Sequence, residues 1–192
     1  MLNHQPTHAN FHAGAGLIAS PGQWHDAIRT LSASQQYHFQ WHLLRLDGGC
    51  RRSRFGDPTS DACLEAHGTR VDPANTVILG CFESGHMRGA AELRSLGATW
   101  GDTAEIAFSV EPRWQGCGIG TALMAALIEA ARERGIARIY ITCHTLNRHM
   151  QRIAETAGAR IDFDGCECVA EIDVVGAPHA GPEHASGPEL HS

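Results

Sequence analysis

The stretch VEPRWQGCGIGTAL, residues 110–123, decides the fold, because three closely spaced glycines stand directly before an apolar helical pattern. Glycine lets a ligand approach the main chain closely, and the first N–H groups of a helix have no acceptor within that helix. These features predict a turn whose N–H groups, from Gln115 to Thr121, bind a phosphate at the positive end of the helix dipole. The neighbouring residues indicate which phosphate-bearing ligand this is.

Two common nucleotide signatures do not match the residues around this turn. A nucleoside triphosphate loop needs GxxxxGK[ST], in which the lysine neutralises phosphates, whereas Gly116 leads to Thr121 without a lysine. A dinucleotide Rossmann site needs an acidic residue at the end of the next strand, where this sequence has Cys143 and His144. The first kind of site is therefore excluded, and the second is disfavoured.

The run GCGIG (116–120) resembles the glycine turn of the S-adenosylmethionine-dependent methyltransferases. That family commonly has an acidic residue two positions before the first glycine, and Trp114 stands there. Its glycine turn also opens a long parallel sheet, whereas only 72 residues follow Gly120. A methyltransferase is therefore the weaker alternative.

The pyrophosphate of coenzyme A fits the turn better. The stretch resembles the signature of the GNAT superfamily of N-acetyltransferases, Gln/Arg-x-x-Gly-x-Gly/Ala, with Gln115, Gly118 and Gly120 in those places. NRHMQRIAETAGA (147–159) is similar to the next helix of that family, which an Asn opens and a Gly-Ala pair closes. The resemblance covers about residues 75–175. It implies an α/β fold with a mixed, mostly antiparallel sheet flanked by helices, the acyl-CoA N-acyltransferase fold, and acetyl-CoA as cosubstrate.

The resemblance also implies where coenzyme A lies. The pantetheine arm would pair with the main chain of Phe108, Ser109 and Val110, and Asn147 would hydrogen-bond the arm. Asn147 would equally serve as a plain helix N-cap. The pyrophosphate cradle is expected to consist of Gln115, Gly116, Cys117, Gly118, Ile119, Gly120 and Thr121. The alternative is a tight strand-to-helix turn whose glycines only allow close packing.

The order of hydrophobic patterns predicts a matching architecture. Helical periodicity spans 24–46 with a break near Ser32, and a loop over 46–58 follows. The remaining predicted elements are a short helix (60–67), an antiparallel meander (75–82, 87–94 and 103–110), a helix ending at Gly135, a buried strand (137–143), a helix (147–158) and two closing strands (159–163 and 167–175).

Composition limits the classes of protein. The 192 residues, 43% of them hydrophobic, suit one domain, expected over 23–175, between flexible tails at 1–22 and 176–192. A net charge of -6 argues against nucleic-acid binding, and no apolar run is long enough for a membrane span. Seven cysteines without a signal sequence indicate a reducing, cytoplasmic location. The sequence does not decide the oligomeric state, and a homodimer stays open.

An amine attacks a thioester only when neutral, whereas a lysine-type ammonium has a pKa of about 10.4, so a proton acceptor is needed. In TAEIAFSV, alternation places Glu105 on the opposite face from Ile106 and Phe108. GNAT members with a glutamate base often carry it on this strand, so Glu105 is the first candidate; a charge on a solvated sheet face is the alternative. Glu92 is the second candidate, although an ion pair with Arg94 explains it better.

The usual proton donor to the leaving thiolate is missing. In many GNAT members a tyrosine seven residues after the helix-opening Asn supplies that proton, and counting from Asn147 gives Ala154. Water, Cys143, Ser109 or a neighbour that the sequence does not identify would then meet the thiolate. Neither Cys143 nor Cys117 is assigned as a nucleophile, because direct transfer needs none and buried thiols are commonly inert.

No metal cofactor is expected. Cys166 and Cys168 would share one strand face, but no second ligand pair lies at suitable spacing. His4, His8 and His12 have helical spacing, yet Pro6 and the small residues around it argue against a helix.

The acceptor is an amine of undetermined identity. LLRLDGGCRRSRFGDP (43–58) is similar to the segment before the sheet in the GNAT domains of bacterial protein acetyltransferases, which implies protein lysine. A small-molecule amine stays open. A function of another class, a coenzyme A-binding regulatory module without catalysis, would be consistent with Ala154.

Overall fold

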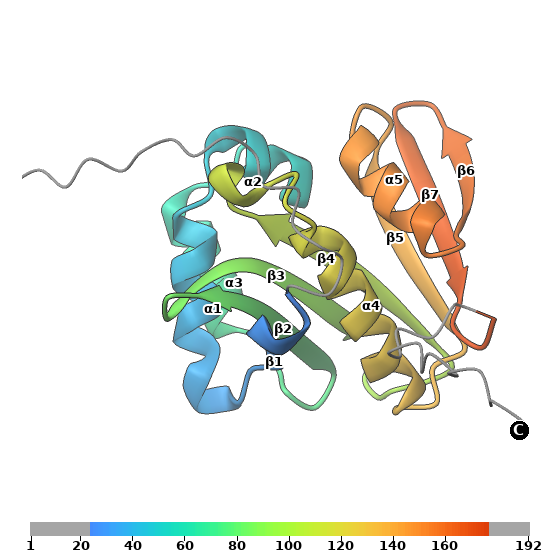
Figure 1. Cartoon of the computed structure of the whole chain (residues 1–192), viewed down its shortest axis with the longest axis horizontal. Coiled ribbons are helices and arrows are strands. Elements are labelled where there is room, and N and C mark those ends of the chain that lie inside the picture. Colours follow the sequence, from blue (N-terminus) through green and yellow to red (C-terminus); the bar gives the residue numbers. More distant parts are fainter. Residues whose placement is uncertain (1–23, 177–192) are drawn as a thin grey trace, which may run out of the picture.

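The computed structural model describes residues 24–176, which form one seven-stranded sheet between two layers of helices (Figure 1). The strand order is β1-β2-β3-β4-β5-β7-β6. The strands are β1 (Ile28–Thr30), β2 (Thr76–Glu83), β3 (His86–Ser95), β4 (Thr103–Val110), β5 (Arg138–His144), β6 (Arg160–Asp164) and β7 (Glu167–Asp173). The helices are α1 (Gln36–Leu44), α2 (Gly48–Phe55), α3 (Asp61–Thr69), α4 (Ile119–Arg132) and α5 (Arg148–Thr156), with short 3₁₀ turns η1 (His25–Ala27), η2 (Ala33–Gln35) and η3 (Pro112–Trp114).

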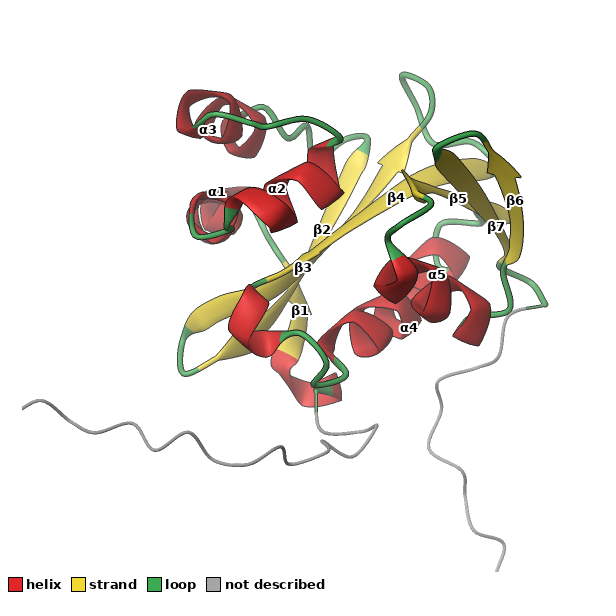
Figure 2. Ribbon diagram, turned by 90° about the horizontal axis from the view of Figure 1, so that it is seen from above, coloured by secondary structure: helices red, strands yellow, loops and turns green. Residues whose placement is uncertain are grey.

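Two hydrophobic clusters hold the helices to the sheet. Figure 2 shows α1, α2 and α3 on one face and α4 and α5 on the other. Ile106 of β4 packs with Leu123 and Leu127 of α4 in one cluster. Phe39 and Leu43 of α1 belong to the other. Each face of the sheet is therefore covered, so alternate residues of a central strand enter different layers.

The junction of β4 and β5 is parallel, and it is short. Pairing runs only from Thr103 opposite Arg138 to Glu105 opposite Tyr140. Beyond Glu105, β4 continues to Val110 along β3, its antiparallel neighbour on the other side. Residues 106–110 therefore have an edge toward β5 that no strand among the described residues covers, and such an edge can pair with an extended ligand.

The predicted order of a meander, a crossover helix, a buried strand and a closing hairpin is confirmed, as is the mixed, mostly antiparallel sheet. The methyltransferase alternative required a long parallel sheet. Within residues 24–176 the sheet contains one parallel pair, β4 and β5, so that alternative is wrong.

The segment before the meander differs from its prediction in two places. The helical pattern assigned to 24–46 includes β1, which pairs with β2 through Arg29 opposite Gly80; three residues are too few to show a strand period. The loop predicted over 46–58 contains α2. Gly48 and Gly49 suggested a loop, but Asp47 caps this helix by accepting a hydrogen bond from Cys50 N at 2.8 Å.

The predicted tails, 1–22 and 176–192, lie outside the described residues except for Gly176. None of the helices between residues 24 and 176 has the length and apolar character that crossing a membrane requires.

Candidate active site

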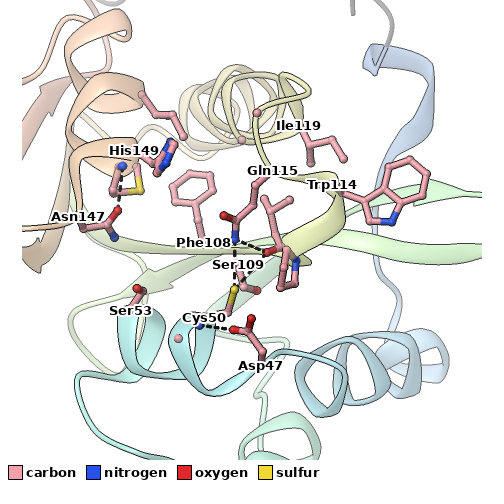
Figure 3. A pocket seen from close by; sticks show the side chains of 17 residues that line it. Asp47, Cys50, Ser53, Phe108, Ser109, Trp114, Gln115, Ile119, Asn147 and His149 are labelled. Atoms are coloured by element: carbon pink, nitrogen blue, oxygen red, sulfur yellow. Dashed lines mark hydrogen bonds between the residues drawn. The ribbon is translucent and has the colours of Figure 1, made fainter. Parts of the chain in front are cut away.

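A pocket of about 390 Å³ lies beside the part of β4 that β5 leaves uncovered. Its walls come from α2, the end of β4, the glycine turn before α4 and the start of α5. Figure 3 shows Cys50 and Ser53 of α2 across from Gln115, with Asn147 and His149 on a third side. Four segments that are far apart in sequence thus meet at the point where the sheet opens.

Most of the predicted coenzyme A residues line this pocket. They are Phe108, Ser109, Val110, Gln115, Gly116, Ile119, Gly120 and Asn147. Cys117, Gly118 and Thr121 belong to the same turn but are not among the lining residues. The structure thus brings the strand, the turn and the helix start to one place.

Glycine is required in this turn for two different structural reasons. Gly116 and Gly118 have φ angles of +74° and +86°, a left-handed conformation that strains residues with a Cβ. Gly120 is needed for packing, because a Cβ there would lie 2.7 Å from Ile153 Cδ1 of α5. The close-packing alternative therefore applies to Gly120, whereas Gly116 and Gly118 shape the turn.

The shaped turn leaves its main-chain donors free. The predicted run of donors begins one residue later than expected, because Gln115 N donates to Pro112 O at 3.3 Å. Within the part of the chain that the structure describes, the N–H groups from Gly116 to Thr121 donate to no other group, and the first helical bond is Ala122 N to Gly118 O at 3.0 Å. Trp24 fixes the turn from outside by donating its Nε1 hydrogen to Cys117 O at 2.7 Å. The fixed, unpaired donors at a helix N-terminus form an anion-binding concavity. No local sequence pattern points to Trp24, because it lies 93 residues from Cys117 in the chain.

Gln115 connects the turn to β4 and α2. Its Nε2 donates to Val110 O at 3.0 Å and lies 3.2 Å from Cys50 Sγ. Burial raises the pKa of the Cys50 thiol to about 11, with a further contribution from Asp47. Cys50 is therefore a neutral thiol near pH 7 and a poor nucleophile. This wall of the pocket was not predicted, because the α2 segment was expected to be a loop.

Asn147 has the capping role that the sequence allowed. Its Oδ1 accepts a hydrogen bond from Met150 N at 3.1 Å, and the residue also lines the pocket. Ala154, about two turns beyond Asn147 along α5, is buried in the core beneath that helix and does not line the pocket.

The two candidate bases lie in different environments. Glu105 is partly exposed at the last β4–β5 pair, just before the uncovered edge begins, and it is not among the pocket-lining residues. Glu92 is buried on β3 and binds Arg54 of α2, His67 of α3 at 3.2 Å and Arg94 at 3.4 Å. Burial alone would raise the pKa of Glu92, but Arg54 and His67 outweigh it and lower the pKa to about 2.

These contacts favour a structural role for Glu92. The ion pairs with Arg54 and His67 join β3 to two helices on one face of the sheet, and the carboxylate has no exposed surface to offer an acceptor. Glu105 is the candidate with access to solvent and to the end of the uncovered edge.

A second buried polar cluster lies directly behind the pocket. Ser109 Oγ is 2.9 Å from Nε2 of the fully buried His42 of α1. His42 Nδ1 lies 3.7 Å from Glu111 Oε1, and Glu111 binds Arg45 at 2.7 Å and Arg88 at 3.1 Å. Ser109 was predicted from the sequence, but the other members of this cluster were not, because α1 and the end of β4 become neighbours only in the fold.

All seven cysteines lie within the described residues and are free. Cys143 and Cys168 face each other on β5 and β7 with their Sγ atoms 3.1 Å apart. Burial raises the pKa of the Cys143 thiol to about 12, so it is not an activated nucleophile. Between residues 24 and 176, no group of three or more His, Cys, Asp or Glu side chains is arranged to hold a metal ion.

The chain is similar to known proteins in sequence and in fold. The model of the acetyltransferase (GNAT) family matches residues 36–159. Among solved structures, the chain is similar to the GNAT domain of PAT from S. lividans, with a TM-score of 0.66 and 24% identity over 76% of this chain and 89% of that chain. No curated protein sequence matches the chain significantly.

Two further structures are similar. A cAMP-binding acyltransferase from Mycobacterium smegmatis has a TM-score of 0.53 and 28% identity; the match covers 77% of this chain but only 43% of that chain. PaiA N-acetyltransferase from Thermoplasma acidophilum, in complex with coenzyme A, has a TM-score of 0.59 and 17% identity over 76% of this chain and 97% of that chain.

Proposed function

Since the chain belongs to the acetyltransferase (GNAT) family, we propose that it transfers the acetyl group of acetyl-CoA to a primary amine by direct attack on the thioester. The observation that supports this proposal is a continuous row of main-chain groups, on one side of the pocket, without hydrogen-bond partners among the described residues. Unpaired N–H groups at the glycine turn lead directly to the uncovered edge of β4.

The residues present fit the donor molecule. The turn from Gly116 to Thr121 offers N–H groups to the pyrophosphate, and the edge from Phe108 to Val110 offers main-chain groups to the pantetheine arm. Asn147, opposite this edge, has an Nδ2 group left for the arm after its Oδ1 caps α5. Acetyl-CoA supplies the activated acetyl group, and the chain orients it.

Glu105 is the proposed general base. An arm that runs from the turn back along β4 reaches the point where β4 and β5 meet, and Glu105 stands at that point. It lies on the same strand face as Ser109, toward the α1–α3 layer. A partly exposed carboxylate there can take a proton from an acceptor ammonium and release it to water.

The acceptor is proposed to be a protein lysine or a small-molecule amine. The similarity to the GNAT domain of PAT supports a protein substrate. This chain contains no lysine, since all 15 of its Lys and Arg residues are arginines. Any acetyl-lysine formed in an assay therefore belongs to the acceptor. Its free cysteines support a reducing, cytoplasmic location as part of the same proposal.

Ligand-dependent thermal unfolding tests the donor. A ligand that binds only the native state raises the apparent melting temperature. We expect stabilisation by acetyl-CoA and none by S-adenosylmethionine; the opposite pattern would contradict the proposed donor.

Release of free coenzyme A thiol, measured with an amine panel and lysine-containing peptides, tests the reaction. Amine-dependent thiol release together with the acetylated product is the expected result. Binding of acetyl-CoA without turnover on any amine would instead support a coenzyme A-binding regulatory module, the alternative that Ala154 permits.

A further inference from the structure

The hydroxyl of Ser109 connects the pocket to a buried imidazole. Ser109 lines the pocket, and its Oγ lies 2.9 Å from His42 Nε2. His42 is fully buried, so it has no contact with bulk water. Among the described residues, the one hydrogen bond of its side chain goes to Ser109, which lines the pocket, so any proton that His42 exchanges with the pocket must pass through Ser109.

The other nitrogen of His42 faces a carboxylate. His42 Nδ1 has no hydrogen-bond partner among the described residues, and Glu111 Oε1 lies 3.7 Å away. Arg45 and Arg88 hold Glu111 in place. Burial by itself raises the pKa of Glu111, but His42 and Arg45 outweigh it and lower the pKa to about 2, so the group is a carboxylate near pH 7.

This order of groups is suited to proton movement. The nearby carboxylate favours the Nδ1–H tautomer of neutral His42, which leaves Nε2 as acceptor for the Ser109 hydroxyl. If His42 gains a proton, the carboxylate stabilises the resulting imidazolium, as an orienting carboxylate does behind a catalytic histidine. Cys50 also lies near Val110, but its Sγ contacts Gln115 and Val110 O and no imidazole.

We propose that Ser109 and His42, with Glu111 as positioning residue, form a proton relay that moves one proton from the attacking nitrogen to the leaving sulfur. The inference rests on the proposed function. It assigns a route for the proton that a tyrosine would supply at the position of Ala154.

The proton balance requires two different paths. An ammonium acceptor loses two protons in becoming an amide; one is released to solvent and the other ends on the thiol of coenzyme A. Glu105, partly exposed, handles the first proton and leaves a neutral amine. That amine forms the C–N bond, and the C–S bond breaks with its electron pair on sulfur.

The relay handles the second proton. Ser109 Oγ receives it from the nitrogen while the original Ser109 proton passes to His42 Nε2. The two transfers then reverse, with Ser109 donating to the thiolate and taking its proton back from His42. Both residues return to their starting state, so no other reactant is needed.

Steady-state kinetics of Ser109→Ala, Ser109→Thr and His42→Gln test the relay. Ser109→Ala is expected to lower kcat by about 100-fold or more, the usual contribution of positioned acid–base groups, with the Kd for acetyl-CoA changed less than twofold. Ser109→Thr keeps a hydroxyl and should retain most of kcat. His42→Gln keeps a hydrogen bond to Ser109, but its amide cannot take up and return a proton near neutral pH. Its kcat should therefore fall as far as that of Ser109→Ala.

A double variant and a matched control separate this role from a structural one. Groups of one relay act as a unit, so Ser109→Ala combined with His42→Gln should lose no more kcat than either alone. Ser95, the last residue of β3, is as buried as Ser109, and its hydroxyl donates to Thr99 O in the loop that follows. Ser95→Ala should lose comparable stability and keep the kcat of the unsubstituted protein. The solvent deuterium isotope effect on kcat should fall in Ser109→Ala and stay unchanged in Ser95→Ala.

Three results would overturn the relay. If the Ser109→Ala protein is folded and acetylates amines as fast as the unsubstituted protein, the relay is wrong and the proposed function stands. An acetyl group found by mass spectrometry on Ser109 would make Ser109 a nucleophile. Absence of amine acetylation by the unsubstituted protein would overturn the proposed function and the relay together.

Discussion

The glycine turn shows how single residues determine the site. Gly118 has a left-handed φ of +86° directly before α4, and the N–H groups that follow it have no partner among the described residues. A side chain at this position strains the turn, and the strain displaces those N–H groups from the pocket.

Gly118→Ala is therefore expected to cost about 1 to 2 kcal/mol of stability, the usual cost of a left-handed non-glycine residue, and to weaken acetyl-CoA binding. Gly165→Ala is the matched control, because Gly165 has a φ of +58° in the β6–β7 turn with open space around it. Urea unfolding should show similar losses in both variants. Calorimetry should show weaker acetyl-CoA binding only in Gly118→Ala, and equal affinities would contradict the cradle.

Glu105→Gln tests the proposed base. It should lower kcat by about 100-fold or more near neutral pH and leave the Kd for acetyl-CoA unchanged, because the carboxylate removes a proton and does not hold the donor. Glu133→Gln is the control for the loss of one negative charge, because Glu133 is an exposed carboxylate at the end of α4. A Glu105→Gln protein with the full rate near neutral pH would show that another group is the base.

The sequence predicted the site residues that belong to continuous motifs. The turn from Gln115 to Gly120 and the cap Asn147 could be found, because glycine conformation and helix capping depend on local chemistry. His42 and Trp24 could not be found, because each acts through one contact with a distant strand or turn. Such contacts leave no periodic pattern in the sequence.

At the scale of elements, local signals were sufficient for the long helices and the meander but not for two short segments. β1 contains three residues and exists because β2 offers it an edge, which is a tertiary cause. The start of α2 contains two glycines, and its stability depends on the Asp47 cap and on Arg51, which donates to Leu46 O at 2.8 Å. Of these two segments, α2 lines the pocket, so the least predictable elements include one of its walls.

The uncovered edge of β4 gives a prediction for hydrogen exchange. Acetyl-CoA should slow exchange of amide hydrogens in residues 106–110 and 116–121, because the arm and the pyrophosphate would accept hydrogen bonds there. Strand β6, at the far edge of the sheet, should be unaffected and serves as internal control. If acetyl-CoA slowed exchange elsewhere but not in β4, the ligand would not use this edge.

At the scale of the whole molecule, two buried carboxylates connect opposite ends of the α1–α3 layer to the sheet. Glu92 joins β3 to α2 and α3, and Glu111 joins the end of β4 to α1 through Arg45. The pKa values of both are lowered from 4.5 to about 2 in the folded protein. The folded state therefore holds fewer protons than the unfolded state in mildly acidic solution.

Acid is accordingly expected to destabilise the fold. The stabilisation from each carboxylate is complete above about pH 5 and is lost as pH falls toward 2, on the order of 3 kcal/mol per group. Urea unfolding between pH 7 and pH 2 measures this loss. Glu92→Gln should be less stable at pH 7, because Arg54 loses its buried partner, and should show a smaller decrease on acidification. A decrease equal to that of the unsubstituted protein would contradict the assignment to Glu92.

The short junction between β4 and β5 has a consequence for how the protein persists in a cell. Only three residue pairs join these strands, and an acetyl-CoA arm bound at the open edge would act as an additional strand in the sheet. Ligand at 100 times its Kd adds about 2.7 kcal/mol to stability by mass action. We therefore expect the protein to survive proteolysis longest when acetyl-CoA is abundant. The lifetime of the protein, as well as its rate, would then follow the supply of its own cosubstrate.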